Sequence, residues 1–310
     1  MSAFSYKPSP CVPFQDMEVL ERVRKIRRED LEKHPNPDFR IKVVPDGQTG
    51  FIIMRDMLAR IKKSSDTGER LVLILPNPSP GYKRIAALIN ALRLNCKNLY
   101  AFGMDEYANE DGEVAPVSWP FGLIHAMMEY FYAEIDEDLR PPENQFVGPT
   151  TKNINDYSKM IEDAGGADMC YSGPGWTGHV AFIEPDAPEF DAPLEDWKKM
   201  GARIVTLSPF TIAQNSLHGS FGMSGDLAAV PPKAATIGPA DVIASRNRIE
   251  THGLGIHGTA TSWQRLVSRL ITHGPVTPRV PGSLHQTLRT DCNISETIAR
   301  DIEPNWNKGY

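Results

Sequence analysis

Residues 172–185, SGPGWTGHVAFIEP, place three glycines within six positions, directly before His179 and Glu184. Glycine is needed where the backbone has a positive φ or approaches another molecule closely. A glycine-rich turn between a strand and a helix also presents backbone N–H groups to a ligand. An imidazole group titrates near neutral pH and transfers protons in both directions. An ordinary turn followed by a solvated histidine and glutamate explains this composition equally well, so the rest of the sequence must decide.

Two further stretches carry polar chemistry at the ends of predicted strands. FGMDEY ends a predicted strand at 98–104, and LPNPSPG follows one at 71–76. The glycine-rich stretch follows a third predicted strand, at 167–173. Ligands of open α/β sheets bind outside the carboxyl ends of the strands. We therefore expect the three stretches to form one site.

The elements that must position these stretches alternate between strand and helix from residue 39 onward. Continuous apolar runs predict strands covered on both faces, and apolar residues at helical spacing predict the helices between them. Strands are expected at 40–44, 71–76, 98–104, 167–173, 202–207, 234–238, 251–256 and 288–292, and helices at 48–63, 85–92, 121–134, 154–164 and 261–270. This alternation predicts an α/β fold with a three-layer, mostly parallel Rossmann-like sheet and helices on both faces.

The chain divides at about residue 38. Residues 1–38 are predicted to form an N-terminal arm and a charged helix at 15–34, and residues 39–310 a single domain. The net charge is −6, and the basic residues at 22–28 are interleaved with acidic ones, so no nucleic-acid partner is expected.

Neither a signal sequence nor a run of 18 apolar residues is evident, which predicts a cytoplasmic protein with no membrane association. The four cysteines have no C-x-x-C spacing, and Cys170 and Cys292 fall in predicted core strands. Reduced, buried thiols are therefore expected at these two positions.

FGMDEY and SGPGWTGHVAFIEP resemble the two motifs of the glucosamine-6-phosphate deaminase/isomerase family, relatives of the 6-phosphogluconolactonases. That family has Phe-x-Met-Asp-Glu-Tyr at the end of a strand and Gly-x-Gly-x-Asp-Gly-His-x-Ala-Phe-Asn-Glu-Pro in its glycine loop. The order of elements agrees from about residue 39 to 300, including PPENQFVGP at 141–149. The lactonase branch typically has Asp-Glu-Arg in the first motif and no Glu-Pro in the second, so the isomerase branch fits better.

The resemblance implies roles for individual residues. Asp105 matches the base that moves a proton between C1 and C2 of the opened amino sugar. His179 matches the histidine that opens the pyranose ring at O5, and Glu184 matches the glutamate that holds this histidine. No cofactor and no metal are implied. The implied substrate-binding residues are Asn77, Ser79, Glu106, Gly173, Gly175, Trp176, Thr177 and Gly178.

The glycine loop departs from the family pattern at one position. Thr177 replaces the family's aspartate, and a threonine forms hydrogen bonds but holds no charge near pH 7. Trp176, which precedes it, offers a flat apolar surface that suits either stacking on a sugar or simple packing.

The phosphate-binding features of the family are also altered. The family's Thr-Gly-Gly-Thr-Pro loop corresponds to residues 75–84, where Pro78 and Pro80 carry no N–H group. The family's phosphate-binding lysine falls at about Thr261, and its arginine falls near His218. Each lost cationic contact weakens phosphate binding by about 1.5–3 kcal/mol. Compensation by Arg203, Arg246 or Arg248 stays open at this point.

The sequence therefore predicts an enzyme that acts on a small-molecule sugar or sugar phosphate. Aldose–ketose isomerisation or deamination of an amino sugar, through ring opening and C1/C2 proton transfer, is the expected reaction, on a substrate that need not carry a 6-phosphate. A catalytically inactive sugar-binding or regulatory homologue and a lactonase-type hydrolase are the alternatives. A homo-oligomer is compatible with the resemblance. No metal is expected, because His252 and His257 are the only histidines near ligand spacing.

Overall fold

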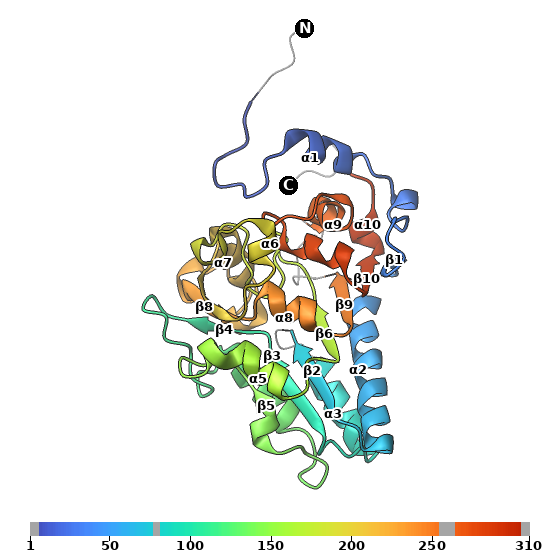
Figure 1. The fold of residues 1–310 in the computed structure, drawn as a ribbon, viewed down its shortest axis with the longest axis vertical. Coiled ribbons are helices and arrows are strands. Elements are labelled where there is room, and N and C mark those ends of the chain that lie inside the picture. Colours follow the sequence, from blue (N-terminus) through green and yellow to red (C-terminus); the bar gives the residue numbers. More distant parts are fainter. Residues whose placement is uncertain (1–5, 77–80, 254–263, 305–310) are drawn as a thin grey trace.

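The computed structural model describes residues 6–76, 81–253 and 264–304 (Figure 1). The strands are β1 (Phe39–Val44), β2 (Leu71–Leu75), β3 (Leu99–Gly103), β4 (Asp105–Ala108), β5 (Phe146–Val147), β6 (Met169–Ser172), β7 (Arg203–Thr206), β8 (Lys233–Thr236), β9 (Arg248–His252) and β10 (Thr290–Ser295). The helices are α1 (Met17–Arg24), α2 (Gln48–Thr67), α3 (Gly81–Ala91), α4 (Leu123–Met127), α5 (Tyr157–Asp163), α6 (Leu194–Trp197), α7 (Pro209–Asn215), α8 (Pro239–Ala244), α9 (Gln264–His273) and α10 (Glu296–Ala299).

The central element is a seven-stranded sheet in the order β1-β10-β9-β6-β2-β3-β5. Every neighbouring pair in it is parallel. Parallel strands need crossover connections, and helices supply most of them here. The predicted α/β fold with a mostly parallel sheet is confirmed.

Helices cover both faces of this sheet (Figure 1). Leu71, Leu73 and Leu75 of β2 join a core cluster with residues of α2 and α3. Val72 and Ile74, which point to the opposite face, join a second cluster with residues of α5 and α8. The whole of β2 is buried, as its uninterrupted apolar run predicted.

The point where the strand order reverses lies between β2 and β6. From β2 the chain continues to β3 on one side, whereas from β6 it continues to β9 and β10 on the other. Adjacent strands whose connections leave in opposite directions open a crevice at their carboxyl ends, and such a crevice is the usual ligand site of these sheets. LPNPSPG and the glycine loop follow the two strands that flank this point.

Three of the predicted strands form a separate antiparallel sheet, in the order β4-β8-β7. The prediction of one strand over 98–104 is wrong at its end, because β3 stops at Gly103 and β4 begins two residues later in the other sheet. In β7 only Val205 is buried, and Thr206 is exposed. Such partial burial suits an antiparallel sheet with one exposed face, unlike the fully buried LVLIL of β2.

Several element boundaries differ from the prediction. The helix expected at 121–134 is α4 followed by a π-helical segment, η2 (Met128–Tyr132). The strand expected at 251–256 begins earlier, as β9, and residues 254–256 of that prediction lie outside the described residues. The helix expected at 261–270 is α9, and its first three predicted residues also lie outside the described part.

The segment before β1 packs against the end of the chain. Leu20 and Val23 of α1 form a cluster with Val267 and Leu270 of α9. The helix is shorter than the expected 15–34, because α1 ends at Arg24 and is followed by an irregular stretch with a single 3₁₀ turn. Within the described residues no helix is long and apolar enough to cross a membrane.

Tyr157 provides a test of how the strand ends are held. Its buried hydroxyl donates to the carbonyl oxygens of Gly103 (2.7 Å) and Val147 (2.9 Å), and so ties the end of β3 to the end of β5. Tyr157→Phe is expected to lower the free energy of unfolding by about 1–3 kcal/mol, because it leaves buried carbonyls without a donor. Urea denaturation measures this. Tyr130→Phe is the control, since Tyr130 is exposed, and an equal loss in both variants contradicts the assignment.

Candidate functional site

The glycine loop leaves the carboxyl end of β6 and turns back over the sheet. Gly178 has a φ of +80°, a conformation that favours glycine, and a side chain there would lie 3.1 Å from both Val267 and Val280. Gly173 is equally confined, because a Cβ would lie 2.8 Å from the carbonyl oxygen of Thr251 at the end of β9. The backbone of the loop is therefore fixed by close packing on its neighbours.

His179 lies at the centre of a buried hydrogen-bond cluster. Its Nδ1 is 2.9 Å from Thr177 Oγ1, 3.1 Å from Thr211 Oγ1 and 3.3 Å from Glu184 Oε2. The Thr177 hydroxyl donates to Glu184 Oε2 at 3.1 Å and thus accepts from Nδ1–H. These contacts fix the tautomer with the proton on Nδ1, so that Nε2 carries the free lone pair. Thr177, His179 and Glu184 are brought together.

Gly175 makes room for the imidazole ring. A Cβ at this position would lie 2.0 Å from His179 Nε2 and 2.2 Å from Cε1. The loop therefore has no side chain where Nε2 and Cε1 of the His179 ring lie. Glycine is needed at this position because the ring occupies the space of a Cβ, and the sequence pattern did not reveal this requirement.

Helix α7 supplies two residues that the sequence analysis missed. Thr211 contacts His179 Nδ1, and the side chain of Gln214 accepts a hydrogen bond from the backbone N–H of Trp176 at 2.7 Å. Both side chains are buried. They lie one turn apart on a short helix without a recognisable motif, so no sequence signal pointed to them.

Asp105 begins β4, directly after the end of β3. Its Cα partner in β8 is Thr236, whose hydroxyl accepts from the backbone N–H of Phe182 in the glycine-loop segment at 3.1 Å. This connection links the strand of Asp105 to the segment that carries His179 and Glu184. The Asp105 carboxyl group is buried and accepts no hydrogen bond within the described residues. Burial, with a smaller contribution from Glu106, raises its pKa well above the usual range.

Glu106 points to the start of α4. Its carboxylate accepts hydrogen bonds from the backbone N–H groups of Tyr107 (2.7 Å), Leu123 (3.0 Å) and Ile124 (2.7 Å). Burial raises its pKa, although these three donors oppose the shift. The contacts support a positioning role for Glu106, and its role in substrate binding stays a prediction.

Asn77 and Ser79, and Thr261 in the predicted lysine position, lie outside the described residues. His218, which falls where the family has an arginine, is half-buried near His179. Burial lowers the pKa of His218 to about 4, so it carries no positive charge at neutral pH.

The three arginines considered as replacements hold backbone carbonyl groups. Arg248 is buried and donates to Val242 and Ser245, and Arg246 donates to Gly165 and Gly166 before β6. Both lie at the amino ends of their strands, opposite the glycine loop. Arg203 donates to the carbonyl oxygens of Gly201 and Glu189 and covers the ring of Phe190.

Buried polar atoms next to His179 have no hydrogen-bond partner within the described residues. They include Glu184 Oε1 and His218 Nε2. A buried polar group without a partner costs about 1–3 kcal/mol. A polar ligand with several hydroxyl groups is the kind of molecule that satisfies such atoms together.

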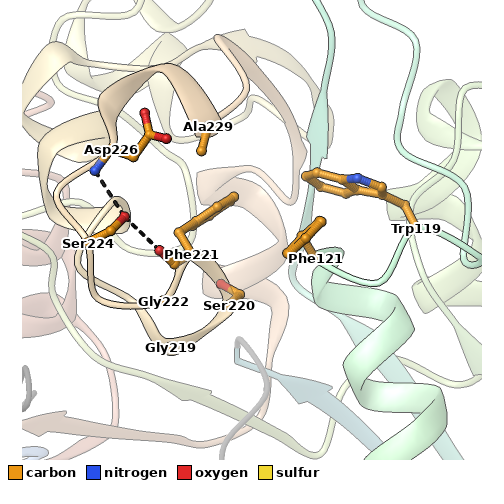
Figure 2. A pocket seen from close by; sticks show the side chains of 9 residues that line it. All are labelled: Trp119, Phe121, Gly219, Ser220, Phe221, Gly222, Ser224, Asp226 and Ala229. Carbon is orange, nitrogen blue, oxygen red and sulfur yellow. Dashed lines mark hydrogen bonds between the residues drawn. The ribbon is translucent and has the colours of Figure 1, made fainter.

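A hollow of about 590 Å³ lies beside this region, lined by aromatic rings (Figure 2). Trp119 and Phe121 face Phe221 across it, and the rings of Phe121 and Phe221 are stacked at 6.2 Å. It includes none of the predicted catalytic residues. Tyr107 connects the two regions, since its ring contacts Trp119, Phe182 and Phe221.

Comparison with known proteins finds glucosamine-6-phosphate deaminases among the proteins similar to this chain. The chain is 29% identical to a glucosamine-6-phosphate deaminase of Caenorhabditis elegans over 199 residues, which is 62% of this chain and 67% of the relative. It is 28% identical to a glucosamine-6-phosphate deaminase of Rhodopirellula baltica over 257 residues, 79% of this chain and 88% of the relative. No family model matches the chain.

Solved structures share the fold. A monomeric glucosamine-6-phosphate deaminase superposes with a TM-score of 0.64 at 19% identity, over 84% of this chain and 98% of the other. The 6-phosphogluconolactonase of Leishmania guyanensis gives 0.57 at 13% identity, over 85% and 98%. The predicted resemblance to this family is confirmed, and so is the prediction of an enzyme of this kind, since its curated relatives are enzymes.

Gly175→Ala tests the fit between the loop and the imidazole ring. The added methyl group overlaps His179 Nε2, so the ring or the loop must move, and the free energy of unfolding is expected to fall by about 1–3 kcal/mol. Thermal denaturation measures the loss. Gly219→Ala is the matched control, because a Cβ there meets nothing within 4 Å. Equal stability of the Gly175→Ala variant and the wild type contradicts this packing.

Proposed function

We propose that this chain, an enzyme similar to the glucosamine-6-phosphate deaminases, opens the ring of an amino sugar and isomerises or deaminates it by proton transfer between C1 and C2. The observation that carries the proposal is the buried His179 cluster, in which Thr177, Thr211 and Glu184 hold one ring nitrogen and leave the other free. Such an arrangement orients an imidazole group for proton transfer at Nε2.

Ring opening is the step assigned to His179. Its Nε2 takes the proton of the O1 hydroxyl and returns a proton to O5, while the C1–O5 bond breaks and the C1 carbonyl forms. Glu184 stabilises the imidazolium group that exists between these transfers, through Thr177 and directly at 3.3 Å. Thr177 thus forms a hydrogen-bond bridge between Glu184 and His179. This role needs no charge on the threonine side chain.

Asp105 is the base proposed for the second step. It removes the proton from C2 of the open-chain sugar while O1 gains a proton, and it then returns the proton to C1 while the 2-amino or 2-hydroxyl group loses one. This isomerisation gives the C2 imine or the ketose. For a 2-amino sugar, water then hydrolyses the C2 imine and releases ammonia. Burial raises the pKa of Asp105, and a base with a pKa nearer the working pH transfers protons more effectively in both directions.

The charge distribution supports a substrate without a terminal phosphate. The cations considered for the family's phosphate site are committed elsewhere: Arg246 and Arg248 bind carbonyl groups at the far end of the sheet, and His218 is neutral because of its lowered pKa. Arg279 contacts the glycine-loop segment, but it donates to the carbonyl oxygen of Pro185 and pairs with Asp191. A free amino sugar in the cytoplasm is therefore the proposed substrate.

Asp105→Asn tests the assignment of the base. The variant is expected to lose about 10²–10⁴-fold in kcat, the usual contribution of a general base. In the wild type, kcat/KM is expected to fall as the pH falls through the pKa of Asp105, at a higher pH than for an ordinary aspartate. The assay follows ammonia and ketose from glucosamine.

The stability of the same variant provides a second measurement. Because the folded-state pKa of Asp105 is raised, protonation favours the folded state, and stability falls as the pH rises through that pKa. Asparagine lacks the charge, so Asp105→Asn is expected to be as stable as the wild type or more so at neutral pH. Asp241→Ala is the control: this buried carboxylate accepts hydrogen bonds from Gly238 N and Ser158, so the variant should lose stability and keep kcat. Full activity of Asp105→Asn contradicts the mechanism.

A ligand screen distinguishes the substrate classes. Thermal shifts are compared for glucosamine and glucosamine 6-phosphate, each over a concentration series. A ligand at a hundred times its dissociation constant stabilises by about 2.7 kcal/mol. We expect glucosamine to stabilise at least as strongly as its phosphate. Much tighter binding of the phosphate contradicts the proposed substrate, binding without turnover indicates the inactive sugar-binding alternative, and acid release from a lactone indicates the hydrolase.

A further inference from the structure

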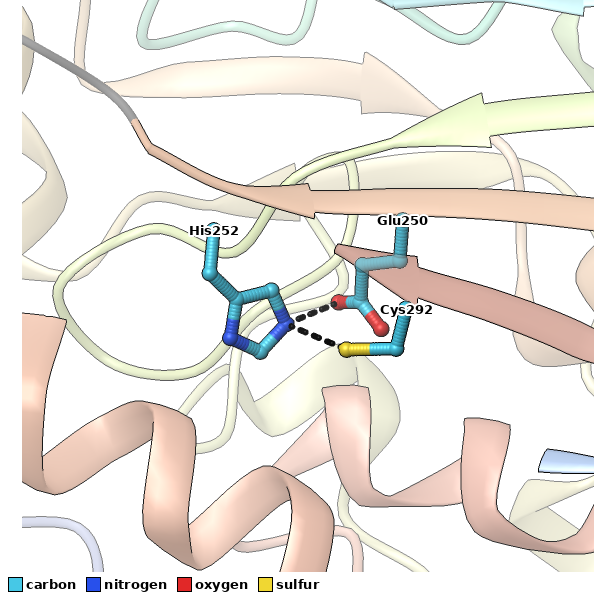
Figure 3. A group of neighbouring side chains, drawn as sticks. All are labelled: Glu250, His252 and Cys292. Carbon is cyan, nitrogen blue, oxygen red and sulfur yellow. Dashed lines mark hydrogen bonds and ion pairs between the residues drawn. The ribbon is translucent and has the colours of Figure 1, made fainter. Parts of the chain in front are cut away.

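A second cluster of ionisable side chains lies inside the sheet, away from the residues assigned to proton transfer. Glu250 and His252 belong to β9, and Cys292 belongs to the neighbouring β10 (Figure 3). Glu250 and Cys292 are Cα partners, and His252 follows Glu250 by two residues, so the three side chains share one face. All three are fully buried.

The separations between the ligand atoms suit a shared metal ion. His252 Nε2 is 3.5 Å from Cys292 Sγ and 3.6 Å from Glu250 Oε1, and the ligand atoms of the three residues all lie within 4.8 Å of one another. Tetrahedral zinc places sulfur and nitrogen ligands about 3.6 Å apart and nitrogen and oxygen ligands about 3.4 Å apart. The two separations from His252 Nε2 are already near these values.

The buried Glu250 carboxylate lies between two histidine rings. Neither of its oxygens has a hydrogen bond within the described residues, and His252 and His285, which each lie 3.6 Å from one of them, pair with it ionically only when protonated. A buried carboxylate is retained when it is paired, hydrogen-bonded or bound to a metal. The unpartnered oxygens are an observation independent of the spacing, and they also point to a cation.

Ser268 of α9 prepares His252 to act as a ligand. Its hydroxyl lies 2.7 Å from His252 Nδ1; in the tautomer in which Nδ1–H donates to it, the lone pair of Nε2 faces Glu250 and Cys292. Histidine ligands of metals are usually oriented by such a hydrogen bond from their second nitrogen. His285 lies 3.6 Å from the other Glu250 oxygen and restrains the carboxylate from the opposite side.

We propose that Glu250, His252 and Cys292 form a buried site for one Zn²⁺ ion. A thiolate, an imidazole and a carboxylate are the ligand types that zinc accepts together, and both Glu250 oxygens are available to complete four positions. No metal was expected from the sequence, because Cys292 is 40 residues from His252 and spacing rules detect only ligands close in sequence.

The role of this ion is structural. The three side chains are inaccessible to solvent, so a substrate does not reach them. The ion joins β9 to β10 and, through His252 and Ser268, to α9. Thr251, between two of the ligands, contacts the glycine loop at Gly173. The ion therefore stabilises the strand against which that loop packs, and the proposal is independent of the proposed reaction.

Cobalt substitution tests the site directly. The full-length protein is freed of metal under reducing conditions and titrated with Co²⁺. One equivalent should bind and produce the near-ultraviolet thiolate-to-cobalt charge-transfer band together with the intense visible bands of a four-coordinate ion. Zn²⁺ should displace Co²⁺ and raise the midpoint of thermal unfolding. A wild-type protein that binds Co²⁺ without the thiolate band, or binds no stoichiometric metal, overturns the proposal without any variant.

Variants assign the ligands. Cys292→Ala should abolish the charge-transfer band, whereas Cys170→Ala should keep it, although both cysteines are fully buried in neighbouring parts of the same sheet. Ser268→Ala removes only the hydrogen bond to Nδ1 and should weaken metal affinity by about 10–100-fold. A band that persists in Cys292→Ala, or that disappears equally in Cys170→Ala, overturns the ligand assignment.

Discussion

The arrangement of the site depends on the close approach of the His179 ring to a backbone that has no side chain at Gly175. Thr177, Thr211 and Glu184 hold Nδ1 from one side, and the absence of a Cβ leaves space for Nε2 on the other. Neither contribution is sufficient alone, because the hydrogen bonds orient the ring only if the loop admits it. The loop in turn is fixed where Gly173 packs on β9 and Gly178 packs on Val267 and Val280.

The position of these residues follows from the order of the strands. At the switch, β2 and β6 lie side by side, so their carboxyl ends meet at one edge of the sheet. Asp105 follows β3, which lies beside β2, and so is placed at the same edge. Asp105 leaves the parallel sheet to begin β4, which pairs with β8. This change of sheet removes the carboxylate from water, and no described residue donates a hydrogen bond to it; burial is the main cause of its raised pKa.

The sequence alone predicted the parallel sheet, because strands buried on both faces read as uninterrupted apolar runs, as in LVLIL. It did not predict the antiparallel sheet, since the short strands β7 and β8 resemble parallel ones until their pairing is known. The grouping of Thr177, His179 and Glu184 was accessible because all three lie in one loop. Thr211 and Gln214, like Cys292 and His285 beside Glu250, come from distant segments, and only tertiary structure brings them to their neighbours.

The hydrogen bonds from Arg203, Arg246 and Arg248 to backbone carbonyl groups affect how fast charged ligands bind. A chain of net charge −6 whose described site contains the carboxyl groups of Asp105, Glu106 and Glu184, with His218 neutral, presents a negative field to an approaching molecule when these groups are ionised. Such a field accelerates the encounter with a cation and slows the encounter with an anion, and added salt reduces both effects. A cationic ligand is thus expected to be captured faster at low ionic strength, and an anionic ligand faster as salt is added. Because Arg246 and Arg248 lie at the amino ends of their strands, their positive charge does not offset the carboxyl groups at the opposite edge of the sheet.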